Sequence, residues 1–251
     1  MKNILVTGGA GFIGSITTLT LIQKGYKVTV IDSYVNSSEI IIKRIKNIIN
    51  SQCPKYLGNF DNFKGDLRDK SFLEDVFIKK INQGINFDGV IHFAGLKSVK
   101  DSITNPIEYW SANIEGTINL IDSMEKFNCK KLIFSSSATI YSLNNNKLIN
   151  ENSRLQPINP YGNTKYVAEI FLSDVFKSQS DKWSIINLRY FNPIGAHNSG
   201  LLGENPIVKP NNIFPIINKV ALGEIEKLEI YGNDWNTPDG TCIRDYIHIM
   251  D

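Results

Sequence analysis

The chain has 251 residues, with 27 Lys and Arg against 25 Asp and Glu and a formal net charge of +2 at pH 7. This near-neutral balance argues against a nucleic-acid-binding protein. Hydrophobic residues make up 42% of the chain, which excludes global disorder, and no segment approaches the ~18 apolar residues of a membrane span. The three cysteines stand far apart, at 53, 129 and 242, so we expect a reduced cytoplasmic protein with neither disulfides nor a metal site.

Predicted strands and helices alternate through the first three quarters of the chain. Short apolar runs predict strands at 4–6, 28–31, 63–66, 90–93, 132–134 and 185–188. Helical spacing of apolar residues predicts helices at 12–25, 37–50, after the capping residue Asp69, at 106–124 and at 161–176. This order predicts an α/β fold with a doubly wound parallel sheet, whose ligands lie beyond the carboxyl ends of the strands.

The composition changes after Arg189. Residues 192–212 are rich in Asn, Pro and Gly, and they are followed by a predicted helix at 213–222 and a predicted strand at 228–231. We therefore expect a dinucleotide-binding domain at 1–189 and a smaller substrate-binding region at 190–251. No closing element follows this second region, which we expect to be incomplete in a truncated chain.

A glycine-rich turn links the first predicted strand to the first predicted helix. Gly8, Gly11 and Gly14, together with Gly9, satisfy both the GxxGxxG and the GxGxxG spacing. Such glycines let the backbone approach a pyrophosphate, and the helix N-terminus supplies N–H donors. An ordinary glycine turn can share this spacing, but the strand–turn–helix context favours a dinucleotide site.

Acidic residues end the next two predicted strands. Asp32 lies 18 residues after Gly14, where a carboxylate would bind a ribose diol. Because a carboxylate repels a 2′-phosphate, NAD is favoured over NADP. Asp66 is equally consistent with an adenine contact and with a helix cap.

A tyrosine and a lysine lie one helical turn apart at Tyr161 and Lys165. A nearby ammonium would lower the pKa of the phenol toward neutrality, so that Tyr161 could remove a proton from an alcohol. Surface Tyr/Lys pairs are common. A catalytic role for this pair is supported by three serines that end the fifth predicted strand and could relay the proton: Ser135, Ser136 and Ser137.

These segments resemble the extended branch of the short-chain dehydrogenase/reductase superfamily, and in particular its nucleotide-sugar 4-epimerases. The similarity covers essentially the whole chain and is concentrated in residues 7–15, 92–97, 134–141, 159–165, 188–197 and 244–251.

The resemblance implies a role for each matching residue. It implies that Tyr161 is the catalytic acid/base and that Lys165 and Ser137 assist it. It implies that NAD, held by the glycine turn, contacts Phe12, Ile13, Asp32, Asn36, Ser37, Asp66, Leu67, Phe93, Ala94, Gly95, Lys97, Tyr161, Lys165 and Phe191. It implies that a UDP-sugar contacts Lys97, Ser137, Tyr161, Asn192, Asn212 and Arg244.

The implied activity is that of an isomerase in galactose metabolism, which interconverts UDP-galactose and UDP-glucose by transient NAD-dependent oxidation at sugar C4. Related dehydratases and decarboxylases carry a carboxylate where this chain has Ala138 and Thr139, so elimination is disfavoured. Two alternatives stay open: a 4-epimerase of UDP-N-acetylglucosamine or UDP-glucuronate, and an NAD-binding scaffold without catalysis. The resemblance further implies a homodimer built from the helices at 106–127 and 161–176.

Overall fold

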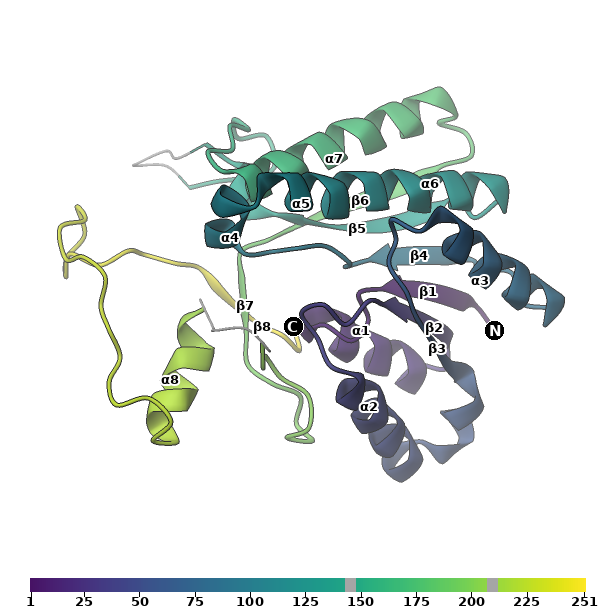
Figure 1. Cartoon of the computed structure of the whole chain (residues 1–251), viewed down its shortest axis with the longest axis horizontal. Coiled ribbons are helices and arrows are strands. Elements are labelled where there is room, and N and C mark those ends of the chain that lie inside the picture. The colour runs from purple at the N-terminus through teal and green to yellow at the C-terminus, as the bar shows by residue number, and fades with distance from the viewer. Residues whose placement is uncertain (143–147, 207–211) are drawn as a thin grey trace.

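The computed structural model describes residues 1–142, 148–206 and 212–251 (Figure 1). Its centre is a six-stranded parallel sheet in the order β3-β2-β1-β4-β5-β6. The strands are β1 (Asn3–Thr7), β2 (Lys27–Asp32), β3 (Phe60–Lys64), β4 (Gly89–His92), β5 (Lys131–Ser137) and β6 (Ser184–Tyr190). The order reverses between β1 and β4, so the predicted doubly wound parallel sheet is confirmed.

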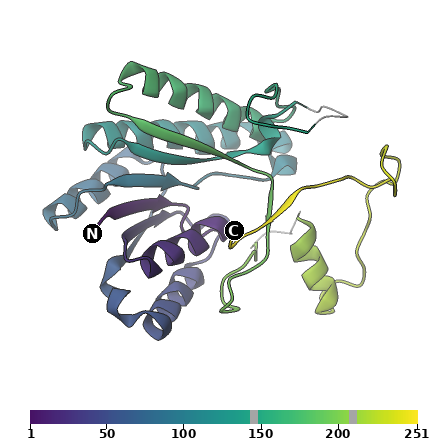
Figure 2. The same cartoon turned by 180° about the vertical axis from the view of Figure 1, so that it is seen from behind.

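Helices cover both faces of the sheet (Figures 1 and 2). One face carries α1 (Phe12–Gln23) and α2 (Glu39–Gln52), followed by the 3-10 helix η1 (Pro54–Asn59). The other carries α3 (Lys70–Asn82), α4 (Val99–Thr104), α5 (Pro106–Trp110), α6 (Gly116–Lys126) and α7 (Pro160–Ser178), with a short 3-10 helix η3 (Ala138–Ile140) after β5. Two separate clusters of buried apolar side chains fill the spaces between these helices and the sheet.

The sequence predicts most of these elements because each buried strand is a short apolar run. The predicted third strand is the least accurate, since β3 begins and ends earlier, at Phe60–Lys64. The long helix predicted at 106–124 is interrupted by a π-helical turn, η2 (Ser111–Glu115), and α4 was not predicted. Asp69 caps α3 as expected, with its side chain accepting from the Phe72 N–H at 3.0 Å.

Residues 190–251 contain short elements beside the carboxyl edge of the sheet (Figure 1). The strands β7 (Asn192–Ile194) and β8 (Tyr246–His248) pair in parallel, and α8 (Ile213–Ala221) lies between them in sequence. The strand predicted at 228–231 is wrong: these residues form no ladder, and Ile230 and Tyr231 are exposed. Alternating apolar residues make a strand only where a neighbouring strand can receive their backbone hydrogen bonds.

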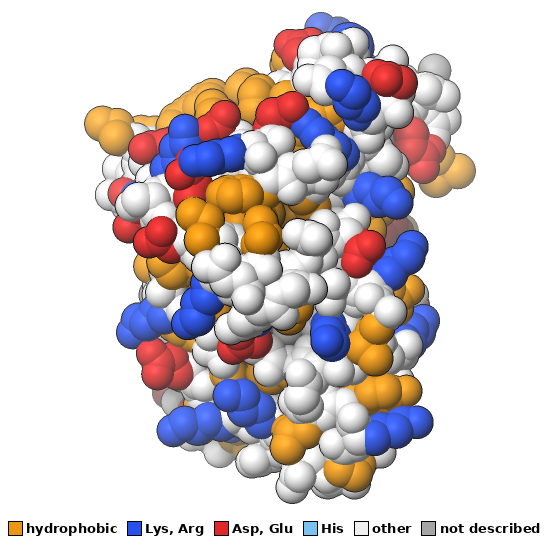
Figure 3. Space-filling model, turned by 90° about the vertical axis from the view of Figure 1, so that its right-hand side faces the viewer, with side chains coloured by type: hydrophobic (Ala, Val, Ile, Leu, Met, Phe, Trp, Pro, Cys, Tyr) orange, Lys and Arg blue, Asp and Glu red, His pale blue; other side chains and the backbone are white. Residues whose placement is uncertain are grey.

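The surface carries charges of both signs. Figure 3 shows Lys and Arg side chains intermixed with Asp and Glu on one face, and hydrophobic side chains gathered along its upper part. Within the described residues, no helix is long and apolar enough to cross a membrane.

Candidate active site

A cavity of about 1380 Å³ opens at the carboxyl edge of the sheet and extends toward β7, β8 and α8. The loops that follow β1, β2, β4, β5 and β6 line it, as expected for a parallel sheet. Every residue that the sequence predicts as a cofactor, substrate or catalytic residue contributes to this lining. The fold therefore brings together residues that are as far apart in the chain as Gly8 and Arg244.

The glycine turn after β1 is packed too closely for side chains. Gly8 has φ +70°, and a Cβ there would lie 2.6 Å from the Ala94 nitrogen. A Cβ on Gly14 would lie 2.2 Å from the Gly8 carbonyl oxygen. The turn can therefore present bare backbone at the N-terminus of α1, which is the surface that a pyrophosphate requires. This observation fits a dinucleotide cofactor.

Asp32 ends β2 beside this turn and is buried. Its Oδ2 accepts a hydrogen bond from the Ala10 N–H at 2.8 Å. Its Oδ1 accepts from the Tyr34 N–H and from the Ser37 hydroxyl, both at 2.9 Å. These three donors hold the carboxylate at the cavity wall in one orientation, as recognition of a ribose diol requires.

Asp66 forms a bidentate ion pair with Arg68, whose Nη2 lies 2.7 Å from Oδ2. Hydrogen bonding from Arg68 holds the pKa of Asp66 below its ordinary value. Asp66 does not cap α3, because Asp69 does so. Of the two interpretations of Asp66, the one as a helix cap is therefore wrong, and the one as a cofactor contact stays a prediction.

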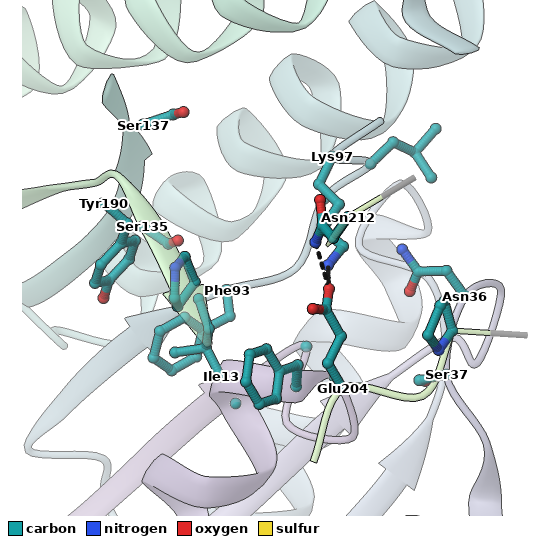
Figure 4. A pocket seen from close by; sticks show the side chains of 18 of the residues that line it. Ile13, Asn36, Ser37, Phe93, Lys97, Ser135, Ser137, Tyr190, Glu204 and Asn212 are labelled. Atoms are coloured by element: carbon teal, nitrogen blue, oxygen red, sulfur yellow. Dashed lines mark hydrogen bonds and ion pairs between the residues drawn. The ribbon is translucent and has the colours of Figure 1, made fainter. Parts of the chain in front are cut away.

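Ser137, Tyr161 and Lys165 meet at the end of β5, where Figure 4 shows Ser135 and Ser137 beside the cavity. The Ser137 oxygen accepts from the Thr139 hydroxyl at 2.9 Å and from the Thr139 N–H at 3.2 Å. Its own proton remains to donate, and Ser137 hydrogen-bonds the Tyr161 phenol. Lys165 Nζ donates to the Ser135 carbonyl at 2.8 Å.

The pKa of Tyr161 differs from the sequence-based prediction. Burial raises it above its ordinary value, and the hydrogen bond with Ser137 offsets part of that rise. Burial also lowers the pKa of Lys165 to about 8. The expected lowering of the Tyr161 pKa by the ammonium is not found, because Lys165 donates to a backbone carbonyl and desolvation dominates.

The loop after β4 is held by Asn113, a buried residue of the π-helical turn. Its Oδ1 accepts from the Leu96 N–H at 2.8 Å, and its Nδ2 donates to the Thr164 hydroxyl at 2.9 Å. A Cβ on Gly95 would lie 2.9 Å from that Oδ1. The π turn thus presents Asn113 to the loop, a use typical of π bulges at functional sites. This role of Asn113 was not predicted from the sequence.

Glu204, whose side chain is nearly buried, was likewise not predicted from the sequence. Its Oε1 lies 2.9 Å from Lys97 Nζ and 2.5 Å from Asn212 Nδ2, and Figure 4 shows both contacts. Lys97 comes from the loop after β4, whereas Asn212 and Glu204 come from the region after β7. The carboxylate therefore joins two residues that were predicted separately.

The cavity is also lined by two residues predicted to contact the substrate, Asn192 and Arg244, and by Phe191, which is predicted to contact NAD. Asn192 Nδ2 donates to the Asp245 carbonyl at 2.8 Å and so ties β7 to the segment before β8. Arg244 is exposed, and its Nη1 donates to the Ile243 carbonyl at 3.1 Å. Phe191 is 42% exposed at the cavity wall.

Comparisons with known proteins agree with this geometry. The family model for GDP-mannose 4,6 dehydratase matches residues 5–251. A bifunctional UDP-glucose 4-epimerase and UDP-xylose 4-epimerase of Pisum sativum is 47% identical and is aligned over 100% of this chain and 69% of its own length. UDP-glucose 4-epimerase 4 of Oryza sativa subsp. japonica is also 47% identical, over 100% of this chain and 65% of its own length.

A solved structure shows the same likeness. The UDP-glucose 4-epimerase of Bifidobacterium longum, in complex with NAD+ and UDP, is similar with a TM-score of 0.89 and 44% identity. The alignment covers 99% of this chain and 70% of that structure.

Proposed function

Since this chain belongs to the family of the UDP-glucose 4-epimerases, we propose that it is an NAD-dependent isomerase that interconverts UDP-galactose and UDP-glucose. The observation that carries the proposal is that Ser137, Tyr161 and Lys165 share one cavity with the glycine turn and Asp32. Proton-transfer residues and a dinucleotide cradle in one cavity are what alcohol oxidation requires. The same combination favours an enzyme over a binding scaffold.

The proposed reaction begins at the hydroxyl on sugar C4. Tyr161 accepts the proton of this hydroxyl and later returns one to the same oxygen, and Ser137 stabilises the phenolate through its hydrogen bond. Lys165, which donates to the Ser135 carbonyl beside Tyr161, assists by holding the end of β5 and the bound NAD in place. NAD, when bound at the glycine turn and Asp32, supplies the reversible redox partner for C4.

Elimination and decarboxylation are disfavoured by the residues after Ser137. Ala138 and Thr139 form the short helix η3, and Thr139 directs its hydroxyl and its N–H to Ser137. Neither position carries a carboxylate that could act as the additional acid or base of an elimination. Reversal of the oxidation at C4 is the outcome that these residues support.

We assign the binding of the cofactor to residues 1–189 and the binding of the UDP-sugar to residues 190–251. We also propose a cytoplasmic homodimer that pairs the outer faces of α5, α6 and α7. Exposed isoleucines on these three helices support the dimer: Ile107, Ile118 and Ile170.

The test uses the purified chain with its natural NAD content and UDP-galactose as substrate. We expect UDP-glucose to form, and Tyr161→Phe to retain NAD while turnover falls by about 100-fold or more. Tyr166→Phe, on the same helix but outside the cavity lining, is the control. Near-normal turnover in Tyr161→Phe would remove Tyr161 from the acid/base role.

A further inference from the structure

A buried ion pair lies behind the serine-rich end of β5, away from the proposed reaction. Glu169 and Arg189 form it with two parallel contacts, Nε to Oε1 at 3.0 Å and Nη2 to Oε2 at 2.7 Å. The side chains are 7% and 19% exposed. Ser136 also donates its hydroxyl to Glu169 Oε1.

The same guanidinium reaches the segment that follows η3. Arg189 Nη1 donates to the Tyr141 hydroxyl at 3.0 Å and to the Glu151 carbonyl at 3.1 Å. Four parts of the chain therefore meet at this ion pair: β5, the segment after it, α7 and β6. Three of these parts, β5, α7 and β6, carry residues of the proposed active site within a few positions of the ion pair's contacts.

The connection between β5 and α7 follows a regular pattern. Tyr161, Lys165 and Glu169 are spaced four residues apart and so share one face of α7. Tyr161 bonds the side chain of Ser137, and Lys165 bonds the carbonyl of Ser135. Glu169 bonds the side chain of the serine between them. Three consecutive strand residues are thus held by three successive turns of the helix.

Of these three helix residues, Glu169 is the most constrained, because it is also paired with Arg189 of β6. A bidentate guanidinium–carboxylate pair has a narrow geometry, and its exclusion from water strengthens it. The Ser137–Tyr161 and Ser135–Lys165 links are single hydrogen bonds between groups that must remain free to interact with ligands. The ion pair holds α7 against β6, so that, with the pairing of β6 to β5 and the Ser136 hydrogen bond, it can define the register of α7 against β5.

We propose that Glu169 and Arg189 are positioning residues, which set the distance and angle between Ser137 and Tyr161. The inference rests on the proposed function for its kinetic consequences but not for its geometry. Neither side chain touches the substrate in this role, because neither Glu169 nor Arg189 lines the cavity.

The experiment compares Glu169→Gln with the unmodified chain in the UDP-galactose assay. Loss of the charge should loosen the pair, and we expect kcat to fall by about 10- to 100-fold while KM and bound NAD change by less than about threefold. Arg189→Lys retains the charge but cannot form the bidentate contact, so it should lower kcat as well. Asp174→Asn, which breaks an exposed ion pair with Lys177 on the same helix, is the matched control and should leave kcat unchanged.

A second readout does not depend on turnover. The phenol of Tyr161 can be titrated by NMR in protein labelled with 13C at the tyrosine ring. Because the bond with Ser137 lowers the pKa of Tyr161, its weakening in Glu169→Gln should raise that pKa further. Asp174→Asn should leave the titration where it is in the unmodified chain.

Should Glu169→Gln fail to fold, Ser136→Ala provides the same test. It removes the link from Glu169 to β5 but leaves the carboxylate paired with Arg189. An unchanged Tyr161 titration together with an unchanged kcat, in whichever variant folds, would overturn the positioning role. If the unmodified chain does not convert UDP-galactose but the titration responds as expected, the proposed function has failed and the positioning role stands.

Discussion

His92 ends β4 and lies buried between two threonines rather than at the cavity surface. The Thr117 hydroxyl donates to the Asn113 carbonyl at 2.6 Å, so its oxygen accepts from His92 Nε2 at 3.0 Å. The Thr7 hydroxyl then donates to Nδ1 at 2.7 Å. These contacts suit the neutral ring. Burial, with the charge of Lys165, lowers the pKa of His92 to about 3.

This environment predicts how stability depends on pH. The folded chain keeps His92 neutral, whereas the unfolded chain protonates it below its ordinary pKa of 6.5. The contribution of His92 to the free energy of unfolding is therefore fully present above pH 6.5. It is lost by about 1.4 kcal/mol per pH unit as the pH drops toward 3. Urea unfolding between about pH 7 and pH 5 measures this slope. His92→Gln should flatten it, whereas His248→Gln, at an exposed position, should not; equal slopes in all three proteins would contradict the buried-histidine explanation.

Asp32 gives a second prediction at the scale of a single side chain. Asp32→Asn keeps the size of the side chain but removes the charge that would bind a ribose diol and repel a 2′-phosphate. We expect NAD to bind about 10- to 100-fold more weakly, with less discrimination against NADP. Calorimetric titration with each dinucleotide measures both effects. Asp122→Asn, which removes an exposed partner of Lys70 on α6, is the control; an NAD affinity equal to that of the control would exclude the ribose contact.

At the scale of elements, the turn between β1 and α1 is packed backbone against backbone. The approach of Gly14 to the Gly8 carbonyl allows the first turn of α1 to begin directly behind the proposed cofactor site. The close contact is between backbone atoms, so no change of side-chain rotamer can relieve the clash that an added methyl group would make.

Gly14→Ala should therefore destabilise the chain and abolish NAD binding. We expect the free energy of unfolding to fall by about 1–3 kcal/mol or more, because the added Cβ forces the turn apart. Thermal unfolding and the NAD content of the purified protein measure the two effects. Gly58→Ala is the matched control, because nothing lies within 4 Å of its added Cβ. A Gly14→Ala protein with normal NAD content would show that the turn can open without loss of the site.

At the scale of the whole molecule, the outer helices carry apolar side chains that a monomer leaves in water. Ile107 on α5 is 85% exposed, and Ile118 and Ile170 are exposed on α6 and α7. Large exposed apolar groups on neighbouring helices are typical of protein–protein interfaces. These helices lie on the opposite side of the sheet from α1 and α2 (Figure 1).

The proposed homodimer predicts that Ile107→Asp shifts the protein toward the monomer. A charge at the centre of an apolar interface is desolvated without a partner, which weakens association by about 10-fold or more. Sedimentation velocity over a range of concentrations measures the change. Leu222→Asp alters an equally apolar, exposed residue outside these helices and should leave association unchanged. A monomer in the unmodified chain at all concentrations would contradict the dimer.

The sequence by itself determined the succession of the six strands of the main sheet and the chemical groups that line the cavity. Buried parallel strands must be short apolar runs, and the groups that follow them converge at one edge of the sheet. For this reason the sequence predicts that the glycine turn, Asp32 and the pair Tyr161 and Lys165 lie at one edge of the sheet, and the structure places them in one cavity.

Tertiary structure alone decided the contacts that join distant segments. Glu204 between Lys97 and Asn212, and Glu169 against Arg189, involve residues whose partners no local spacing reveals. The absence of a strand at 228–231 has the same origin, because a strand depends on a neighbour. The raised pKa of Tyr161 likewise reflects burial by side chains from other elements, since desolvation depends on the packed surroundings rather than on the adjacent sequence.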